Sequence, residues 1–211
     1  MKKVLSVLLA LLLFLSFMPS SDGVGFLPGD IVILGSYEQD NNPANGREPI
    51  EWIVLDAQSE KALLVSAAVL DTQAYHNSLE DISWEDCTIR SWLNYYFLNT
   101  AFTTAEQKQI LTATVPSDKN PRNSTDPGNI TNDKVFLLSY HEAVKHFASD
   151  ADRQCTATAY VKAQANYDDN LEKETYSWWL RSPSYAQFLT DWVDNEGKMI
   201  PKIRMNVHNL V

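Results

Sequence analysis

The first third of the chain contains three apolar segments separated by polar turns. Residues 30–36, 50–56 and 61–66 are rich in Val, Ile and Leu, and a loop of Asp, Asn, Pro and Gly at residues 40–46 divides the first from the second. Such segments, bounded by turn-forming residues, are typical of strands. Because only residues 57–60 join the second segment to the third, the pattern predicts an antiparallel meander.

The middle of the chain changes to helical spacing. Ser or Thr stands three residues before an acidic residue at 83–86, 103–106 and 139–142, which is the pattern of a capping box. After the first box, apolar side chains recur with the spacing of a helix packed on a core: Ile89, Trp92, Leu93, Tyr96 and Phe97. We therefore predict helices beginning at these three boxes and a fourth helix over residues 156–165.

Strand patterns return in the last third. Residues 177–182, 188–193 and 198–204 have strand character, and D-N-E-G at residues 194–197 forms the turn between the last two. A short apolar segment at residues 135–138 predicts one more strand. Strands, then helices, then strands predict an α+β fold with helices inserted between an N-terminal meander and C-terminal strands. We assign residues 29–211 to a single domain.

The chain begins with two lysines and an uncharged apolar run over residues 4–18, followed by small and polar residues. This order is typical of a secretory signal peptide, which we assign to residues 1–21. The run is shorter than the roughly 20 residues of a spanning helix, and no second run is long enough, so we expect no membrane span in the mature chain. A retained anchor is the alternative, because no A-x-A triplet marks the cleavage site. The expected location is secreted or associated with the cell envelope.

The charge of the chain excludes one class of binding partner. Removal of residues 1–21 would leave 27 acidic residues against 15 basic ones (17 minus Lys2 and Lys3), a net charge of −12. A protein with this charge repels phosphate, so we expect no nucleic-acid partner.

The two cysteines, Cys87 and Cys155, leave two interpretations open. In an exported chain they can form a disulfide, which would close a loop of 68 residues (155 minus 87) and contribute about 4 kcal/mol. A pair of buried thiols explains them equally well.

The sequence has few features of a catalytic or metal site. His141 and His146 are five residues apart, about 140° around a helix, so they cannot bind one ion from the same face. The loop at residues 40–46 resembles a calcium loop, but its glycine stands one position late, and a plain turn explains it better. No G-x-S-x-G or glycine-rich phosphate motif occurs. We predict no catalytic residue, no metal site and no cofactor. Calcium is the one ion for which the sequence gives any support, and that support is weak.

The stretch Y-S-W-W-L-R-S-P at residues 176–183 combines side chains that fill cores with side chains that bind ligands. In a strand, Trp178 faces the core, whereas Trp179 and Arg181 share the other face. There Arg181 can pair with one of three carboxylates: Glu51, Asp86 or Glu142. We favour a structural clamp over a ligand site for this face. The ligand-binding candidates lie here and at the following hairpin: Trp179, Arg181, Trp192, Asp194 and Asn195.

Seven motifs follow one another in a fixed order. They are G-S-Y at 35–37, P-I-E-W-I-V-L-D at 49–56, W-E-D-C-T-I-R-S-W-L-N at 84–94, Phe102, D-K-V-F-L-L-S at 133–139, R-Q-C at 153–155 and W-W-L-R-S-P at 178–183. Together they resemble a large family of exported bacterial domains of uncharacterised activity, common in Firmicutes. That family is similar in architecture to C-type lectins and formylglycine-generating enzymes, which implies a C-type-lectin-like mixed fold.

The resemblance also affects how single residues are interpreted. We take the following as structural: Arg90, Trp92, Asn94, Trp178, Cys87 and Cys155. Residues 198–211 depart from the family's usual ending, which implies a shortened C-terminus.

The function expected from these observations is an exported, non-catalytic domain that binds a glycan or a protein. The alternative is an oxidase of the formylglycine-generating kind, or another cysteine-dependent enzyme. It ranks second because those oxidases place both cysteines near the C-terminus, unlike Cys87 and Cys155.

Overall fold

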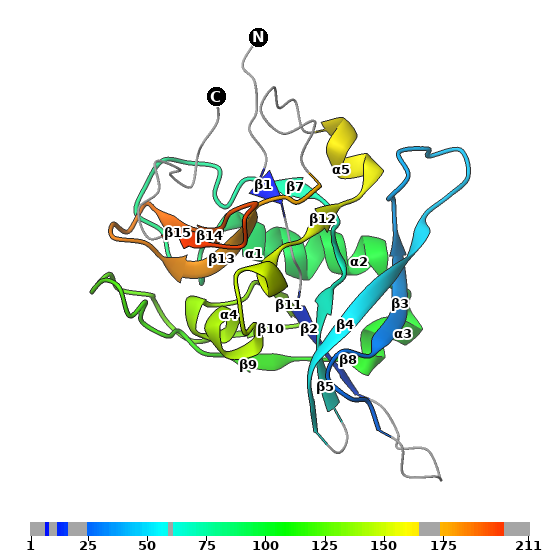
Figure 1. The fold of residues 1–211 in the computed structure, drawn as a ribbon, viewed down its shortest axis with the longest axis horizontal. Coiled ribbons are helices and arrows are strands. Elements are labelled where there is room, and N and C mark those ends of the chain that lie inside the picture. Colours follow the sequence, from blue (N-terminus) through cyan, green and yellow to red (C-terminus); the bar gives the residue numbers. More distant parts are fainter. Residues whose placement is uncertain (1–6, 9–11, 17–24, 59–60, 165–173, 201–211) are drawn as a thin grey trace.

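The computed structural model describes residues 7–8, 12–16, 25–58, 61–164 and 174–200. Its main sheet contains the predicted meander of β3 (Ile31–Tyr37), β4 (Glu48–Gln58) and β5 (Lys61–Ser66), paired antiparallel in chain order (Figure 1). Val32 and Leu34 of β3 are buried, whereas Ile31 and Ile33 are exposed, as the alternation of a strand requires. The meander prediction is confirmed.

A further strand, β2 (Leu12–Ser16), lies inside this sheet. It pairs antiparallel with β5 along one side and with β8 (Ile110–Leu111) and β11 (Val135–Phe136) along the other. These residues belong to the predicted signal peptide, and so does β1 (Val7–Leu8). The predicted cleavage after Ser21 lies outside the described residues.

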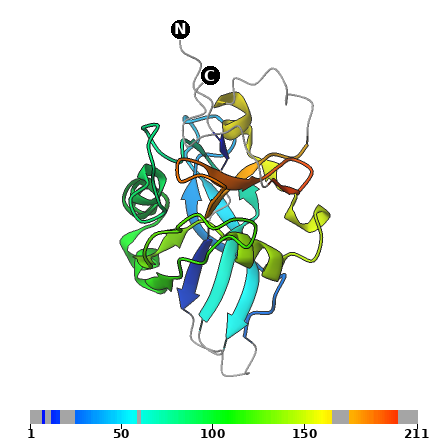
Figure 2. The same ribbon diagram turned by 90° about the vertical axis from the view of Figure 1, so that its left-hand side faces the viewer.

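The helices from residues 88–109 lie together on one side of the molecule, whereas the helix at residues 140–146 packs on β13 (Trp178–Pro183) on the other side (Figure 2). α1 (Thr88–Trp92), a π-helical turn η1 (Leu93–Phe97) and α2 (Leu98–Ala101) form one continuous helix. The capping box predicted at residues 83–86 is wrong. The N–H groups of Asp86 and Cys87 donate to the Ser83 carbonyl and form a turn, and α1 begins at Thr88 without a side-chain cap.

The other two capping boxes are confirmed. Thr103 and Glu106 cap α3 (Thr104–Gln109), and Ser139 and Glu142 cap α4 (Tyr140–His146), each through a reciprocal pair of side-chain to backbone bonds. The helix predicted over residues 156–165 is shorter, because residues 156–157 form β12 (Thr156–Ala157) and only α5 (Ala159–Gln164) is helical. A 3₁₀ turn, η2 (Ala151–Arg153), precedes β12.

A second sheet has the order β15–β14–β13–β1–β7. β13 (Trp178–Pro183) and β14 (Thr190–Val193) are antiparallel, and β14 turns into β15 (Met199–Ile200) through the predicted hairpin, in which Gly197 has a φ of +82°. The predicted strand over residues 198–204 continues beyond the described part. β1 joins β13 in parallel and β7 (Thr72–Gln73) antiparallel.

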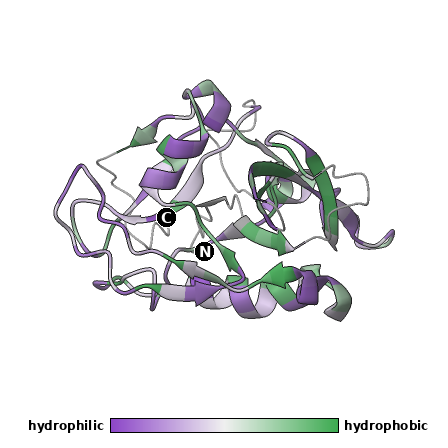
Figure 3. Cartoon of the chain, turned by 90° about the horizontal axis from the view of Figure 1, so that it is seen from below, coloured by the Kyte–Doolittle hydropathy of each residue, from purple (hydrophilic) through white to green (hydrophobic). Residues whose placement is uncertain are grey.

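Two small pairs complete the fold: β6 (Ala68–Val69) with β12, and β9 (Ala113–Val115) with β10 (Thr131–Asp133). Hydrophobic residues concentrate in the strands at the centre, and hydrophilic residues in the outer loops (Figure 3). The main sheet is a curled antiparallel half-barrel in a mixed structure, so the α+β prediction is confirmed at that level. Among the described residues, no helix has the length and apolar character needed to cross a membrane.

Candidate functional site

Arg181 is a buried structural clamp, with a side chain only 3% exposed. Its guanidinium donates from Nη1 to Glu142 Oε2 at 2.5 Å and from Nη2 to Glu142 Oε1 at 2.9 Å, and it also reaches the carbonyls of Leu137 and Pro116. Glu142 was one of the three expected partners. Burial raises the pKa of Glu142, but the hydrogen bonds and charge of Arg181 outweigh it, so the pKa is lowered overall.

The tryptophans beside Arg181 are interior side chains. Every residue of β13 is buried, so both faces of the strand face protein, and the predicted difference between its faces is lost. Trp178 Nε1 donates to the Arg153 carbonyl at 3.0 Å, and Trp179 Nε1 donates to the Gln73 carbonyl at 3.2 Å. Trp192 is half-buried beside Trp179, with ring centroids 6.4 Å apart.

Asp194 and Asn195 form the β14–β15 turn. Asp194 Oδ1 accepts from the N–H groups of Glu196 and Lys198 at 2.9 and 2.8 Å, and the Asn195 carbonyl accepts from the Thr175 hydroxyl at 2.7 Å. These contacts give both residues an internal structural role. Of the five predicted ligand-binding residues, two therefore lie in the buried strand β13, and the other three lie in β14 and the turn that follows it.

The residues interpreted as structural lie at contacts between elements. Arg90 Nε donates to Asp133 Oδ1 at 2.7 Å. The Asn94 amide donates to the carbonyls of Arg90 and Val135, and its oxygen accepts the N–H groups of Lys134 and Val135, so one side chain joins the helix to β11.

Cys87 and Cys155 are both free thiols, so the disulfide that the sequence left open is not formed in this structure. Cys87 belongs to the main core, and Cys155 lies beside a smaller cluster around Val69 and Val161. Burial raises the pKa of each thiol to about 12. At neutral pH both are therefore protonated and weakly nucleophilic.

Two aromatic rings on the continuous helix reach the surface, although the half-buried Trp92 also packs against the main core. The rings of Trp92 and Tyr96 are stacked, with centroids 5.8 Å apart and planes at 29°, and Tyr96 is 54% exposed. The predicted apolar stripe is therefore correct except at Tyr96: Trp92 packs against the core, and three members are buried, Ile89, Leu93 and Phe97. The π-helical turn lies at this position, and π turns occur frequently at functional sites.

Tyr160 of α5 extends this surface. The buried Tyr37 ring lies 5.2 Å from Phe97 and 6.2 Å from Tyr160, so it connects the helix to α5. The pKa of Tyr160 is raised, first by burial and then by the charge of Asp71, with smaller contributions from Tyr96 and Glu38. We call Trp92, Tyr96 and Tyr160 the aromatic surface.

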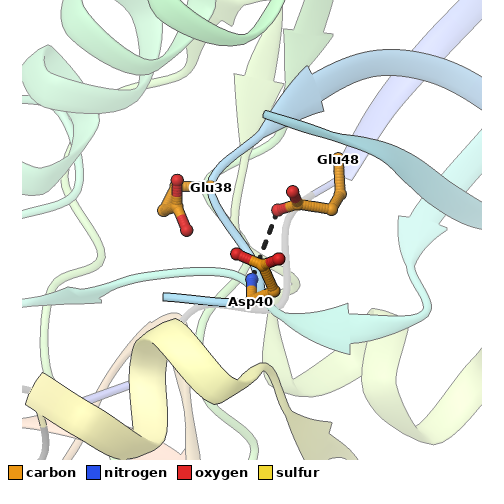
Figure 4. A group of neighbouring side chains, drawn as sticks. All are labelled: Glu38, Asp40 and Glu48. Atoms are coloured by element: carbon orange, nitrogen blue, oxygen red, sulfur yellow. Dashed lines mark hydrogen bonds between the residues drawn. The ribbon is translucent and has the colours of Figure 1, made fainter. Parts of the chain in front are cut away.

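Three carboxylates lie beside Tyr160: Glu38 and Asp40 follow β3, and Glu48 begins β4. Glu38, Asp40 and Glu48 each bring an oxygen within 4.8 Å of the others (Figure 4). We call residues 38–48 the acidic loop. It is joined to α5 by the bond from the Tyr160 N–H to the Gln39 carbonyl at 2.9 Å.

Internal donors hold the acidic loop in place. Glu48 Oε2 accepts the N–H groups of Gln39 and Asp40 at 2.6 and 3.2 Å, and Glu38 Oε1 accepts that of Asn42 at 2.8 Å. The Asn45 amide donates to Asp40 at 2.7 Å and lowers the pKa of that carboxyl group. The loop thus presents negative charge on a fixed backbone, and its oxygens can accept from hydroxyl groups or coordinate a cation.

Comparison with known proteins gives a family but no characterised relative. The family model described as a domain of unknown function (DUF6273) matches residues 59–210. The chain belongs to this family. No curated protein and no solved structure matches it. The DUF6273 match includes all three rings of the aromatic surface, whereas the acidic loop precedes it.

The sequence reasoning did not identify this surface. Trp92 and Tyr96 have the i, i+4 spacing of a core stripe, and the π-helical turn that accompanies their exposure has no signal in the sequence. The sequence did single out Asp40 as part of a loop. Glu38 and Glu48 join it only because β3 and β4 pair antiparallel, with Tyr37 opposite Glu48.

Proposed function

We propose that this member of the DUF6273 family is an exported, non-catalytic domain that binds carbohydrate at the aromatic surface and the acidic loop. One observation carries the proposal: Tyr160 interacts electrostatically both with Tyr96 of the stacked, partly exposed rings and with Glu38 of the fixed carboxylates. Binding sites commonly combine aromatic side chains with a few well-placed polar groups. Export, at or beyond the cell envelope, is supported by the leader pattern of residues 1–21.

A pyranose ring fits this combination chemically. Its C–H face is apolar and packs on an aromatic ring, while its hydroxyl groups donate to carboxylate oxygens. The stack of Trp92 and Tyr96 would take the apolar face, and Glu38 and Asp40 would accept from the hydroxyls. The Tyr160 hydroxyl, like that of an ordinary tyrosine, is protonated at neutral pH and can donate.

The C-type-lectin-like architecture belongs to the same proposal. The antiparallel meander, the inserted helices and the C-terminal strands support it. In calcium-dependent lectins a bound ion ligates the sugar, whereas here the carboxylates of the acidic loop would accept directly from the ligand.

The test is a glycan array followed by titration of the best ligand. Tyr96→Ala removes half of the ring stack from an exposed position, so we expect at least tenfold weaker binding with little change in melting temperature. Tyr95→Ala is the matched control, because Tyr95 is 77% exposed and projects roughly a quarter turn around the same helix. If the folded protein binds no glycan at micromolar concentration, or if both variants bind alike, the proposal is wrong.

Cysteine-dependent catalysis ranks second because both thiols have raised pKa values, Cys87 is buried and Cys155 is half-buried. Replacing Cys87 and Cys155 by Ser discriminates between the two functions. We expect reduced stability and unchanged glycan binding. Loss of an oxidase activity in a folded Cys87→Ser/Cys155→Ser variant would rank catalysis above glycan binding.

A further inference from the structure

Strand β2 fills the gap between β5 on one side and β8 and β11 on the other. We call this gap the channel. Leu12 to Ser16 lie opposite Val65 to Lys61 of β5. On the other side, Phe14 and Leu15 pair with β8, and Leu12 and Leu13 pair with β11. Among the described strands, β2 is the only hydrogen-bonded connection from the β3–β4–β5 meander to β8 and β11.

The channel selects side chains by face. Leu13 and Leu15 point to one face and are 0% and 4% exposed in the main core. Phe14 points to the other face, where the centroid of its ring lies 6.1 Å from that of Phe136. Lys61 Nζ lies 5.8 Å from the centroid of the Phe14 ring. At the end of the strand, the Ser16 hydroxyl donates to the Gln109 carbonyl at 2.9 Å.

The channel could not remain empty in a stable fold. Without β2, the edge of β5 would expose unpaired N–H and carbonyl groups, although its residues from Ala62 to Val65 are buried. Buried backbone groups are almost always paired, and leaving them unpaired is costly. An open edge of this kind is a template for another strand.

We propose that this channel is a strand-acceptor site for an extended apolar segment, with Leu12–Ser16 as its built-in occupant. Its specificity is for large aliphatic side chains at two alternating positions with an aromatic side chain between them. Where the leader is removed, the channel takes a strand of the same pattern from another polypeptide by β-augmentation. That last step rests on the export assumed in the proposed function, whereas the acceptor property does not.

The experiment uses the whole chain with a protease site placed between Ser16 and Gly25. The cut protein is unfolded in denaturant and refolded with a hundredfold excess of a labelled peptide, L-L-F-L-S flanked by lysines. We expect the label to co-elute with the domain. The uncut chain is the control and takes up far less label, because its own segment has a high effective concentration.

Variant peptides test the face selection. Replacing the residues that correspond to Leu13 and Leu15 by Asp is expected to weaken uptake at least tenfold, whereas replacing Phe14 by Leu weakens it much less. The proposal is overturned if the domain stays folded without label, if it aggregates despite the peptide, or if the Asp peptide binds equally. Glycan binding is measured separately, so failure here and failure of the proposed function are distinguishable.

Discussion

The Arg181 clamp and the aromatic surface contain similar side chains in opposite environments. Both place tryptophan or tyrosine rings beside carboxylates. In the clamp, the Arg181 and Glu142 side chains satisfy each other, and Trp178 and Trp179 both donate to carbonyls. On the surface, the stacked rings reach solvent, and three carboxylates lie together.

The difference shows that residue type alone does not identify a binding site in this fold. A motif such as W-W-L-R-S-P has the composition of a binding hot spot, yet its polar atoms bond within the domain. Capacity for a ligand remains where rings are exposed and carboxylates are not paired with arginine. Variants of the two regions should therefore divide into effects on stability and effects on binding.

The largest effect is expected for Arg181→Lys. Lysine keeps the charge but cannot bridge both Glu142 oxygens and two carbonyls, and disrupting a buried ion pair is strongly destabilising. We expect a loss of about 3 kcal/mol in the free energy of unfolding, or about 6–12 °C in melting temperature. Urea denaturation measures it, with the exposed Lys198→Arg as control. Unchanged stability with lost ligand binding would contradict a structural role for Arg181.

The next effect is a pH dependence of stability. Since the pKa of Glu142 is lowered in the folded state, the stability it contributes is fully present above its unfolded pKa of about 4.3 and is lost as pH falls through the folded pKa. The stability difference between the wild type and Glu142→Gln should therefore shrink toward pH 3, as measured by urea unfolding. Buried Asp71 and Asp191 have raised pKa values and the opposite sign, but they are common to both proteins. A difference independent of pH would contradict the ion pair.

A smaller effect separates two neighbouring tryptophans. Trp179 Nε1 donates to the Gln73 carbonyl, whereas the buried Trp192 Nε1 has no hydrogen-bond partner in the described part of the chain. Trp179→Phe should destabilise the domain by about 1 kcal/mol more than Trp192→Phe, the value of one hydrogen bond. Neither variant should alter glycan affinity. Equal losses would mean that ring packing alone determines the effect.

The smallest effect is expected for calcium. The carboxylates of the acidic loop already accept internal N–H donors, so we expect calcium and then chelator to move the melting temperature by less than about 1 °C. Asp40→Asn is the control. A rise of several degrees that chelator reverses and Asp40→Asn abolishes would make the loop a cation site and the sugar contact metal-mediated.

The sequence predicted the elements whose signals are local. The meander follows from apolar alternation between turn residues, and the helices after Thr103 and Ser139 follow from reciprocal caps. It also placed Glu142 among the partners of Arg181. It missed the local turn at Ser83, whose carbonyl takes the N–H groups of Asp86 and Cys87 in place of a capping box. It also missed what depends on distant pairing: the strand at residues 12–16 forms against β5, about 50 residues along the chain. The aromatic surface was missed because stripe spacing does not report exposure.

The position of β2 in the sheet has a consequence for the order of events during synthesis. Leu13 cannot meet Val135 until 122 further residues (135 minus 13) have been made, which takes about 6 to 24 s at common translation rates. Closing so long a loop also carries an entropic cost before the contact forms. During that interval the apolar N-terminal segment lacks its β11 neighbour, although β5 is made much earlier. Folding therefore competes in time with any factor that recognises an emerging apolar segment, and that factor meets the segment first.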